Sequence, residues 1–331
     1  MHPALQTPLL SLLGCQLPIM LAGMGGVARH RLAAAVANAG GFGCMGMVRE
    51  PPDRIAAEIK ALRALSSAPF AINLIPAATD AALLKRQVTT CLSEQVPVMV
   101  LFWEVDAPLV RHLKAAGVTV IHQVGTVAAA EAALAAGADA LIAQGVEAGG
   151  HVHGTVSTLA LLPEVVALSD VPVAAAGGIG SGAALVAALA LGAQGVSLGS
   201  ALLATHEANA HPHHQQRLLA ASAEETVYTR QFARNWHEPA PVRVLPNAVT
   251  AGAYAEEAAR GESPEIGQQD GQPIYLFSTD SPLADATGRL DDMALYAGQS
   301  CGQITTLCSA AERIEQIIGE AEQTLRRLIR T

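Results

Sequence analysis

The chain has 331 residues, of which 51% are hydrophobic and 15% are charged, and its formal net charge at pH 7 is −9. An acidic chain without a block of Lys or Arg is a poor match for nucleic acid or an anionic membrane, so we expect neither as a partner. The five cysteines are scattered and include no C-x-x-C pair, which argues against a disulfide framework and a structural zinc site.

Residues 1–20 have no basic stretch before their apolar part and are interrupted by prolines and a glycine, which is untypical of a signal peptide. No apolar run reaches the length of a membrane-spanning helix; "VPVMVLFW" at 96–103 is the size of a strand. We therefore expect a cytoplasmic protein. The sequence leaves open whether it is a monomer or a homodimer.

Short apolar runs alternate with alanine-rich helical segments from Leu17 to about Ser200. This strict alternation predicts an α/β fold with a parallel sheet that is buried on both faces. The count of eight strands favours a closed (β/α)8 TIM barrel over an open doubly wound sheet. The predicted strands are 17–21, 42–46, 70–75, 96–103, 118–122, 138–143, 171–176 and 194–199.

From about 205 to 290 the sequence has fewer strand-like runs and more proline, glycine and polar residues. We predict that 205–290 is a smaller, mostly helical capping domain. The barrel would then comprise 1–204 and 291–331, and the second part would end in a helical tail.

The active site of a TIM barrel lies at the C-terminal ends of its strands. In this chain those ends carry glycines and polar residues, whereas the opposite loops are plain. We therefore expect these segments to form a ring around one site. They are "AGMGG" (22–26), Asn73, His122-Gln123, "QGVEAGGHVHG" (144–154), "AGGIGSG" (176–182) and Gly199-Ser200.

Glycines after the last two strands, followed by a helix start, are typical of a barrel phosphate site. The backbone amides of Gly177, Gly178, Gly199 and Ser200 would be the donors; tight turns and a helix cap are the alternative. "GIGSGA" (178–183) also matches a dinucleotide fingerprint, but the acidic residue that a Rossmann site requires about 20 residues later is missing.

His151 follows two glycines that allow the backbone to pass close to a flat ligand. A neutral imidazole can accept a proton near pH 7, so His151 is the candidate base, with an ordinary loop histidine as the alternative. His153 has a weaker claim. Glu147 could be a second base, but we expect it to pin the turn through backbone hydrogen bonds. The histidines at 206, 211, 213 and 214 match no standard metal-ligand spacing, so we expect no metal site.

Together these motifs resemble the nitronate monooxygenases, formerly called 2-nitropropane dioxygenases. The resemblance covers about 17–200 and resumes at "YAGQS" (296–300). It implies an FMN-binding barrel with a small capping domain. The matching segments are "PIMLAGMGG", "AVANAGGFG", "FAINL", "AQGVEAGGHVHG", "VPVAAAGGIGSG", "ALALGAQGVSLGSALLAT" and "AGQSCG".

The resemblance implies that His151 is the catalytic histidine over the flavin and that Gln123 stands where some relatives have Lys. Gly178, Gly199 and Ser200 would hold the phosphate. The other residues that it places around the flavin or at the closure of its pocket are Ala22, Gly23, Met24, Asn73, Gln144, Gly145, Gly149, Gly150, Tyr296 and Gln299.

The implied activity is FMN-dependent oxidation of alkyl nitronates, and of the parent nitroalkanes, by O2 to a carbonyl compound and nitrite. "AGGH" (148–151) and "EANAHP" (207–212) also look like the flavin-dependent enoyl-acyl-carrier-protein reductases, and quinone reductases share the barrel. An NAD(P)H-dependent reductase therefore remains the alternative. A flavin-binding module without turnover is a third possibility, but it gives the histidine no role.

Overall fold

The structure, a computed structural model, describes residues 2–236 and 240–329. Its centre is a sheet of eight parallel strands in the order β1-β9-β8-β6-β5-β4-β3-β2. The two edges meet, because Leu21 N donates to Phe42 O at 2.9 Å and Phe42 N donates to Ile19 O at 2.8 Å. The TIM barrel is therefore confirmed. Its strands are β1 (Ile19–Leu21), β2 (Gly43–Gly46), β3 (Phe70–Leu74), β4 (Val98–Phe102), β5 (Thr119–Val124), β6 (Ala140–Gln144), β8 (Val173–Ala176) and β9 (Gly195–Leu198).

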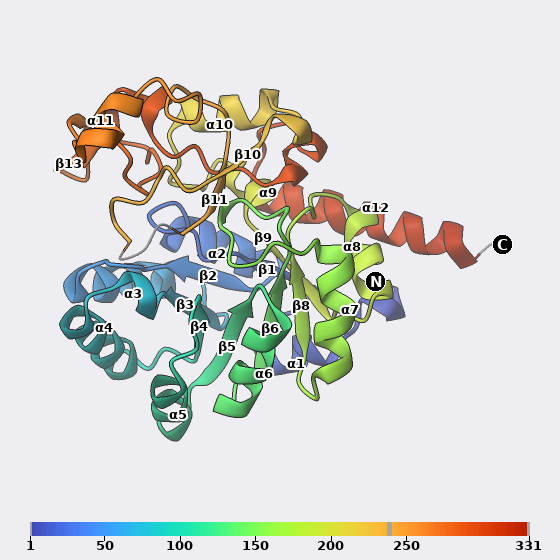
Figure 1. Cartoon of the computed structure of the whole chain (residues 1–331). Helices are drawn as coiled ribbons and strands as arrows, with labels where there is room; N and C mark the ends of the chain where they lie inside the picture. Colours follow the sequence, from blue (N-terminus) through green and yellow to red (C-terminus); the bar gives the residue numbers. More distant parts are fainter. Residues whose placement is uncertain (1, 237–239, 330–331) are drawn as a thin grey trace.

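Helices connect the strands and cover the outside of the barrel (Figure 1). Short polar side chains start several of them; Asp80, for example, accepts from Ala82 N and Leu83 N at the start of α4. The helices of the barrel part are α1 (Pro8–Leu13), α2 (His30–Asn38), α3 (Pro52–Leu65), α4 (Ala81–Ser93), α5 (Ala107–Ala115), α6 (Val127–Ala136), α7 (Thr158–Leu168), α8 (Gly182–Ala190), α9 (Ser200–Leu203) and α12 (Ala310–Ile329), with short 3-10 turns η1 (Pro3–Leu5), η2 (Pro76–Ala78) and η5 (Gln299–Gln303).

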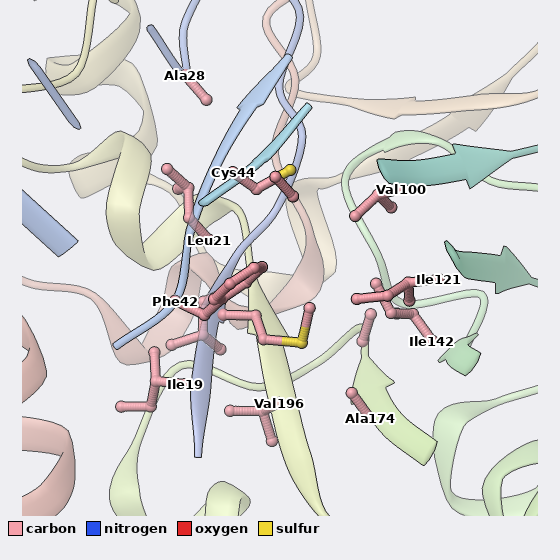
Figure 2. Close-up of a cluster of buried hydrophobic side chains, with 14 of the residues drawn as sticks. Ile19, Leu21, Ala28, Phe42, Cys44, Val100, Ile121, Ile142, Ala174 and Val196 are labelled. Carbon is pink, nitrogen blue, oxygen red and sulfur yellow. The ribbon is translucent and has the colours of Figure 1, made fainter. Parts of the chain in front are cut away.

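Apolar side chains fill the barrel interior. Figure 2 shows Ile19, Leu21, Phe42 and Val196 gathered in this core, and each of them is at most 1% exposed. Such close packing makes the interior a solid core and leaves room for a cavity only at an end of the barrel.

The predicted C-terminal helical tail is α12, which packs against α8. The two helices approach closely at Gly182, where an added Cβ would lie 2.2 Å from Ala321 N. This crossing ties the end of the chain to the last βα unit. Within the described residues, no helix is long and apolar enough to cross a membrane.

The segment 205–290 lies beyond the C-terminal ends of the strands in Figure 1. We expected it to be mostly helical, but it is mixed, with short strands in two three-stranded sheets, β10-β11-β7 and β13-β12-β14. Its own apolar core includes Phe232 and Leu276. The elements are α10 (Pro212–Ala220), η3 (Ala223–Glu225), β10 (Val227–Thr229), β11 (Val242–Val244), α11 (Ala255–Arg260), β12 (Glu265–Gln269), β13 (Gln272–Tyr275) and β14 (Thr287–Gly288), followed by η4 (Leu290–Asp292).

The strands that replace the expected helices in 205–290 have a local cause in the sequence. Asp270 and Gly271 form the turn of the β12–β13 hairpin with φ of 50° and 69°. Asp-Gly is a strong signal for a tight hairpin because both positions take positive φ. The other sheet contains β7 (Gly150–His151), so the glycine-rich turn of the barrel pairs with β11.

Candidate functional site

A cavity of about 620 Å³ lies at the C-terminal ends of the barrel strands. Residues at or just beyond the ends of all eight barrel strands line it. The β12–β13 hairpin adds Gln269, Asp270, Gln272 and Ile274 from the other side. The ring of loops that the sequence predicts therefore surrounds one cavity, and the segment 205–290 contributes to its wall.

Most of the predicted site residues line this cavity, including the catalytic candidate His151. Two do not. A Cβ on Gly145 would lie 2.1 Å from Thr158 Oγ1, so Gly145 packs against α7, and Gln299 lies between the lining residues Gly298 and Ser300. The predicted residues that line the cavity are Ala22, Gly23, Met24, Asn73, Gln123, Gln144, Gly149, Gly150, His151, Gly177, Gly178, Gly199, Ser200 and Tyr296.

Side chains hold the glycine-rich turn after β6 in place. Gln144 Nε2 donates to the carbonyl oxygen of His151 at 2.9 Å, and its Oε1 accepts from His153 N at 3.2 Å. Glu147 accepts from Thr158 N at 2.9 Å and from Thr158 Oγ1 at 3.0 Å. The expected role of Glu147 in pinning the turn is confirmed, and the turn presents His151 from a fixed backbone.

The glycines after β8 and β9 form an amide-rich corner of the cavity. Gly177 and Gly178 have φ of 103° and 72°, which L side chains rarely adopt. Within the described part of the chain, the amides of Gly178, Gly199 and Ser200 donate no hydrogen bond to another protein group. Free amides that face a cavity suit an anion.

The start of α8 is less available than the sequence suggests. Gly182 N donates to Glu320 Oε2 at 2.9 Å, and Gly180 N donates to Gln303 Oε1 at 3.2 Å. These two C-terminal side chains satisfy the first amide of α8 and the amide of Gly180 just before the helix. An anion at this corner would therefore bind the amides of Gly178, Gly199 and Ser200.

His151 lies beneath an aromatic side chain. Its imidazole stacks on the indole of Trp236, with centroids 4.1 Å apart and planes at 23°. His151 Nε2 is buried and has no hydrogen-bond partner among the described residues. Burial, and secondly the positive charge of Arg49, lower the pKa of His151 to about 3. The imidazole is therefore neutral at physiological pH, and its Nε2 forms no hydrogen bond with the described residues.

His153 packs against the same aromatic cluster through Trp103. Its ring lies 4.9 Å from that of Trp103, and it does not line the cavity. Trp103 also lies 4.8 Å from Trp236 and 6.2 Å from His151, so it contacts both histidines. This arrangement agrees with the weaker claim of His153.

Asn73 and Tyr296, two further predicted site residues, each donate a hydrogen bond to a backbone carbonyl oxygen. Asn73 is 4% exposed, and its Nδ2 donates to Val100 O at 3.1 Å. Tyr296 is partly buried, and its hydroxyl donates to Thr279 O at 2.7 Å. Burial raises the pKa of Tyr296, so this residue stays a neutral phenol. Both side chains are held in fixed positions at the cavity wall.

Sequence reasoning missed several residues at this site, chiefly Arg49, Ile75, Phe102 and Trp236, all of which line the cavity. Arg49 follows β2, and Phe102 ends β4. Both residues lie at the C-terminal ends of barrel strands, where the active site of a TIM barrel is expected. The ends of these two strands were not considered in the sequence-based prediction. Trp236 lies in the segment 205–290 and carries no local signal.

The histidines that precede and begin α10 have structural roles. His211 Nδ1 accepts from His213 N at 3.1 Å at the start of the helix, and His213 pairs with Asp291 at 2.9 Å. His214 is fully buried and donates to Tyr296 O at 2.9 Å. Among the described residues, no group of three or more His, Cys, Asp or Glu could hold a metal ion.

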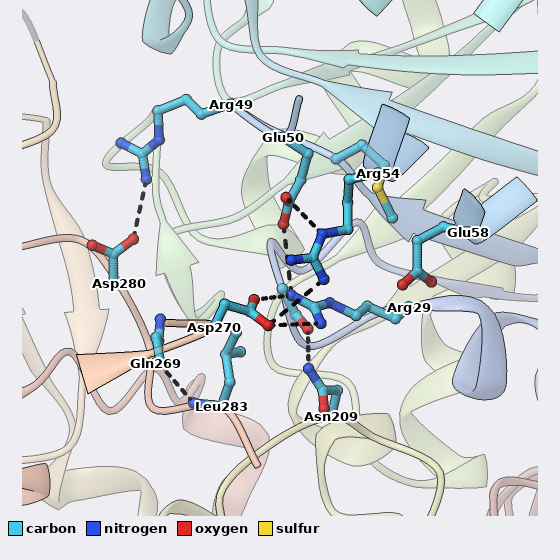
Figure 3. A network of polar contacts seen from close by, with 12 residues as sticks. Arg29, Arg49, Glu50, Arg54, Glu58, Asn209, Gln269, Asp270, Asp280 and Leu283 are labelled. Carbon is cyan, nitrogen blue, oxygen red and sulfur yellow. Dashed lines mark hydrogen bonds and ion pairs between the residues drawn. The ribbon is translucent and has the colours of Figure 1, made fainter. Parts of the chain in front are cut away.

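The mouth of the cavity carries a network of charged side chains (Figure 3). Asp270, at the tip of the β12–β13 hairpin, contacts Arg29 and Arg54. Both arginines also lie 3.8 Å from Glu50. The hairpin is thus fastened to the barrel by one carboxylate that two arginines share.

Comparison with known proteins agrees with this architecture. The family model described as nitronate monooxygenase matches residues 6–320. The chain is 33% identical to a hydroxy-methyl-oxo-octahydro-indene-carboxyl-CoA dehydrogenase of Mycobacterium tuberculosis, over 96% of each chain. It is 30% identical to a nitronate monooxygenase of Paraburkholderia phytofirmans, over 97% of this chain and 96% of that one. The structure of FabK from Thermotoga maritima superposes with a TM-score of 0.83 at 31% identity, over 98% of each chain.

Proposed function

The chain belongs to the nitronate monooxygenase family of flavin-dependent oxidoreductases, and from this premise we propose that it oxidises alkyl nitronates with O2 to a carbonyl compound and nitrite, using FMN. Neutral nitroalkanes are the second proposed substrate of the same site. The observation that carries the proposal is His151, which lines the cavity with a neutral imidazole whose buried Nε2 has no hydrogen-bond partner among the described residues.

The residues present fit FMN. The free amides of Gly178, Gly199 and Ser200 suit its phosphate, and FMN needs no site for an adenosine group. Gly23 lines the cavity, and a Cβ on it would lie 2.4 Å from Asn73 Cβ, so a larger residue would displace the Asn73 side chain from the wall. Gln123 lines the cavity and is proposed to face the polar edge of the ring. FMN, when bound, accepts the electrons of the substrate and passes them to O2.

The task of His151 depends on the substrate. A nitronate is already an anion, and the imidazole only has to contact it. A neutral nitroalkane must first lose its α-proton, and Nε2 of His151 is the proposed acceptor. A pKa of about 3 makes the free imidazole a weak base. Negative charge that develops on the substrate beside it would raise that pKa during the transfer, because an adjacent anion favours the imidazolium.

The proposed reaction can be tested by mixing the purified protein anaerobically with ethyl nitronate and following the flavin absorbance. We expect the nitronate to bleach the flavin and the readmission of O2 to restore it with release of nitrite. NADH should leave the absorbance unchanged. Bleaching by NADH without a response to the nitronate would contradict the proposal.

A reductase is the second candidate function. The observation that favours it is the 33% identity with a dehydrogenase named for a CoA-linked substrate, which is higher than the 30% identity with the named nitronate monooxygenase. In that case NADH or NADPH would bleach the flavin. An enoyl thioester or a quinone would then reoxidise it under anaerobic conditions.

A further inference from the structure

We propose that Arg49 binds the negative charge of the substrate and that Val48, Ile75, Phe102 and Trp236 bind its organic part. The substrate class would be a compact organic anion with its charge at one end and an apolar chain at the other. This inference deepens the proposed function, and it rests on that function for the identity of the anion as a nitronate.

The backbone at Arg49 is unusual. Its φ is 59°, in the left-handed region that residues other than glycine adopt uncommonly. Such conformations cluster at sites that bind or react, where the surrounding structure enforces them. Arg49 directly follows Val48, and both line the cavity. The strained backbone therefore turns a cationic side chain into the site.

The positive charge of Arg49 is only weakly compensated. Among the described residues its one carboxylate contact is with Asp280 at 3.5 Å, while its hydrogen bonds go to neutral groups, Asn235 O at 2.9 Å and Thr279 Oγ1 at 3.2 Å. By contrast, Arg29 and Arg54 at the mouth share Glu50 and Asp270. Figure 3 shows Arg49 apart from that cluster. Among these arginines, Arg49 has the most charge available for a ligand.

Arg49 also lies near the groups that would meet the substrate. Its charge lowers the pKa of His151 and opposes the rise in the pKa of Tyr296. An anion bound between Arg49 and His151 would neutralise this charge. Coulomb attraction in a partly dry cavity is stronger than in water, so the guanidinium would select an anion over a neutral molecule.

An apolar wall adjoins the cation. Ile75 and Phe102 belong to a buried cluster at the ends of β3 and β4, and Val48 and Trp236 pack against it. All four residues line the cavity. No second free cation faces this wall among the described lining residues, so a dianion would leave one charge unpaired. The wall therefore suits a hydrocarbon chain.

The test measures binding without turnover. The chain has two tryptophans, Trp103 and Trp236, and both belong to this aromatic cluster, so intrinsic tryptophan fluorescence reports on this site. The purified protein is titrated with acetate, butyrate and hexanoate, which carry the anionic head but cannot be oxidised as nitronates are. We expect saturable binding that tightens roughly three- to fourfold for each added CH₂ group.

Variants separate binding from support of the fold. Arg49→Gln should weaken butyrate binding about tenfold or more, and Arg49→Lys should restore part of it. Asp280→Asn removes the carboxylate that competes for Arg49 and should tighten binding, which a merely structural Arg49 would not do. Arg217→Gln is the matched control, because this arginine pairs with Asp291 and does not line the cavity; the butyrate affinity of this variant should stay within about twofold of the wild type.

Equal butyrate affinity in the wild type and Arg49→Gln would overturn the inference, as would weaker binding in Asp280→Asn. A flat dependence on chain length, or the same dependence in Phe102→Ala, would overturn the apolar part. Carboxylates are bound but not turned over. If their affinity depends on Arg49 and on chain length as expected, but the protein does not oxidise nitronates, the proposed function is wrong and the anion site stands. If Arg49→Gln leaves nitronate turnover unchanged, Arg49 does not bind the substrate, and the proposed function still stands.

Discussion

The indole of Trp236 lies nearly parallel to the imidazole of His151, with ring centroids 4.1 Å apart. This contact removes water from the imidazole and is part of the burial that lowers the pKa of His151 to about 3. The two residues come from different parts of the fold, since His151 lies in β7 and Trp236 in the segment 205–290. The protonation state of the barrel's histidine therefore depends on that segment.

The first prediction is that Trp236→Ala raises the pKa of His151 toward its ordinary value. A base works only when deprotonated, so kcat/KM for nitroethane should fall as the pH drops below about 6 in this variant. In the wild type, kcat/KM for nitroethane should stay constant to a lower pH. The pH profiles of the two proteins provide the measurement, and superimposable profiles would contradict the assigned role of the stack.

The second prediction separates the two substrates of His151. His151→Asn keeps a polar side chain but cannot accept a proton at neutral pH. Turnover of a neutral nitroalkane should fall by about 10²–10⁴-fold, while a substantial share of nitronate turnover remains. Nitrite release from nitroethane and from ethyl nitronate gives both rates. His153→Asn is the control, and it should change either rate much less because His153 does not line the cavity.

An equal loss on both substrates would have a different meaning. It would show that the imidazole positions the substrate or stabilises its charge, because a preformed nitronate has no α-proton to lose. No loss on either substrate would leave His151 without a catalytic role.

The third prediction concerns flavin retention. Gly178→Asp places a carboxylate at the amide corner, and aspartate tolerates the positive φ of 72° better than most residues. The variant should fold but purify without yellow colour, because its charge repels the phosphate. Gly117→Asp is the matched control, since Gly117 has a φ of 82° and no atom within 4 Å of an added Cβ. The measurement is the flavin absorbance per mole of purified protein. A Gly178→Asp variant with as much flavin as the wild type would refute the phosphate assignment.

Much of this site was accessible from the sequence because it depends on local patterns. Alternating apolar runs and helices predict the barrel, and the barrel assigns the site to the strand ends. This is how Gly178, His151 and Asn73 were found. Arg49 and Phe102 obey the same rule, but neither belongs to a glycine-rich motif that attracts notice.

Other features depend on contacts between distant parts of the chain. The stacking of Trp236 on His151 joins residues 85 positions apart, and no local pattern encodes it. Glu320 satisfies Gly182 N from 138 residues away, which is why the start of α8 looked free in the sequence. The β12–β13 hairpin is the exception, because its Asp270-Gly271 turn is a readable signal.

The fourth prediction concerns the hairpin that closes the cavity. Asp270→Asn removes the charge that fastens the hairpin tip to Arg29 and Arg54. These groups are partly exposed, so we expect a loss of stability below about 1 kcal/mol. Hydrogen exchange of the β12–β13 amides should nevertheless become faster, with the barrel strands unchanged. Asp291→Asn, which breaks another carboxylate contact with an arginine, Arg217, is the control and should leave the hairpin's exchange unaltered.

The last prediction is a dependence of stability on pH. His214 is fully buried, its Nε2 donates to Tyr296 O, and burial lowers its pKa to about 4. Between that value and about 6.5, the unfolded chain binds a proton that the folded chain does not, so the free energy of unfolding decreases as the pH falls. The full effect of this group is roughly 3 kcal/mol, and it is absent at pH 7 and above.

His214→Gln should retain a donor for Tyr296 O but has no charge to gain, so it should lose less stability than the wild type between pH 7 and pH 4.5. Urea unfolding at the two pH values gives the four free energies that are needed. The comparison uses the difference between pH values within each protein, because the substitution also changes packing at pH 7. His151 titrates over the same range and keeps part of the slope in the variant. His112→Gln, which removes an exposed imidazole on α5, should follow the wild type. Equal slopes in the wild type and His214→Gln would mean that His214 is already able to take up a proton in the folded protein.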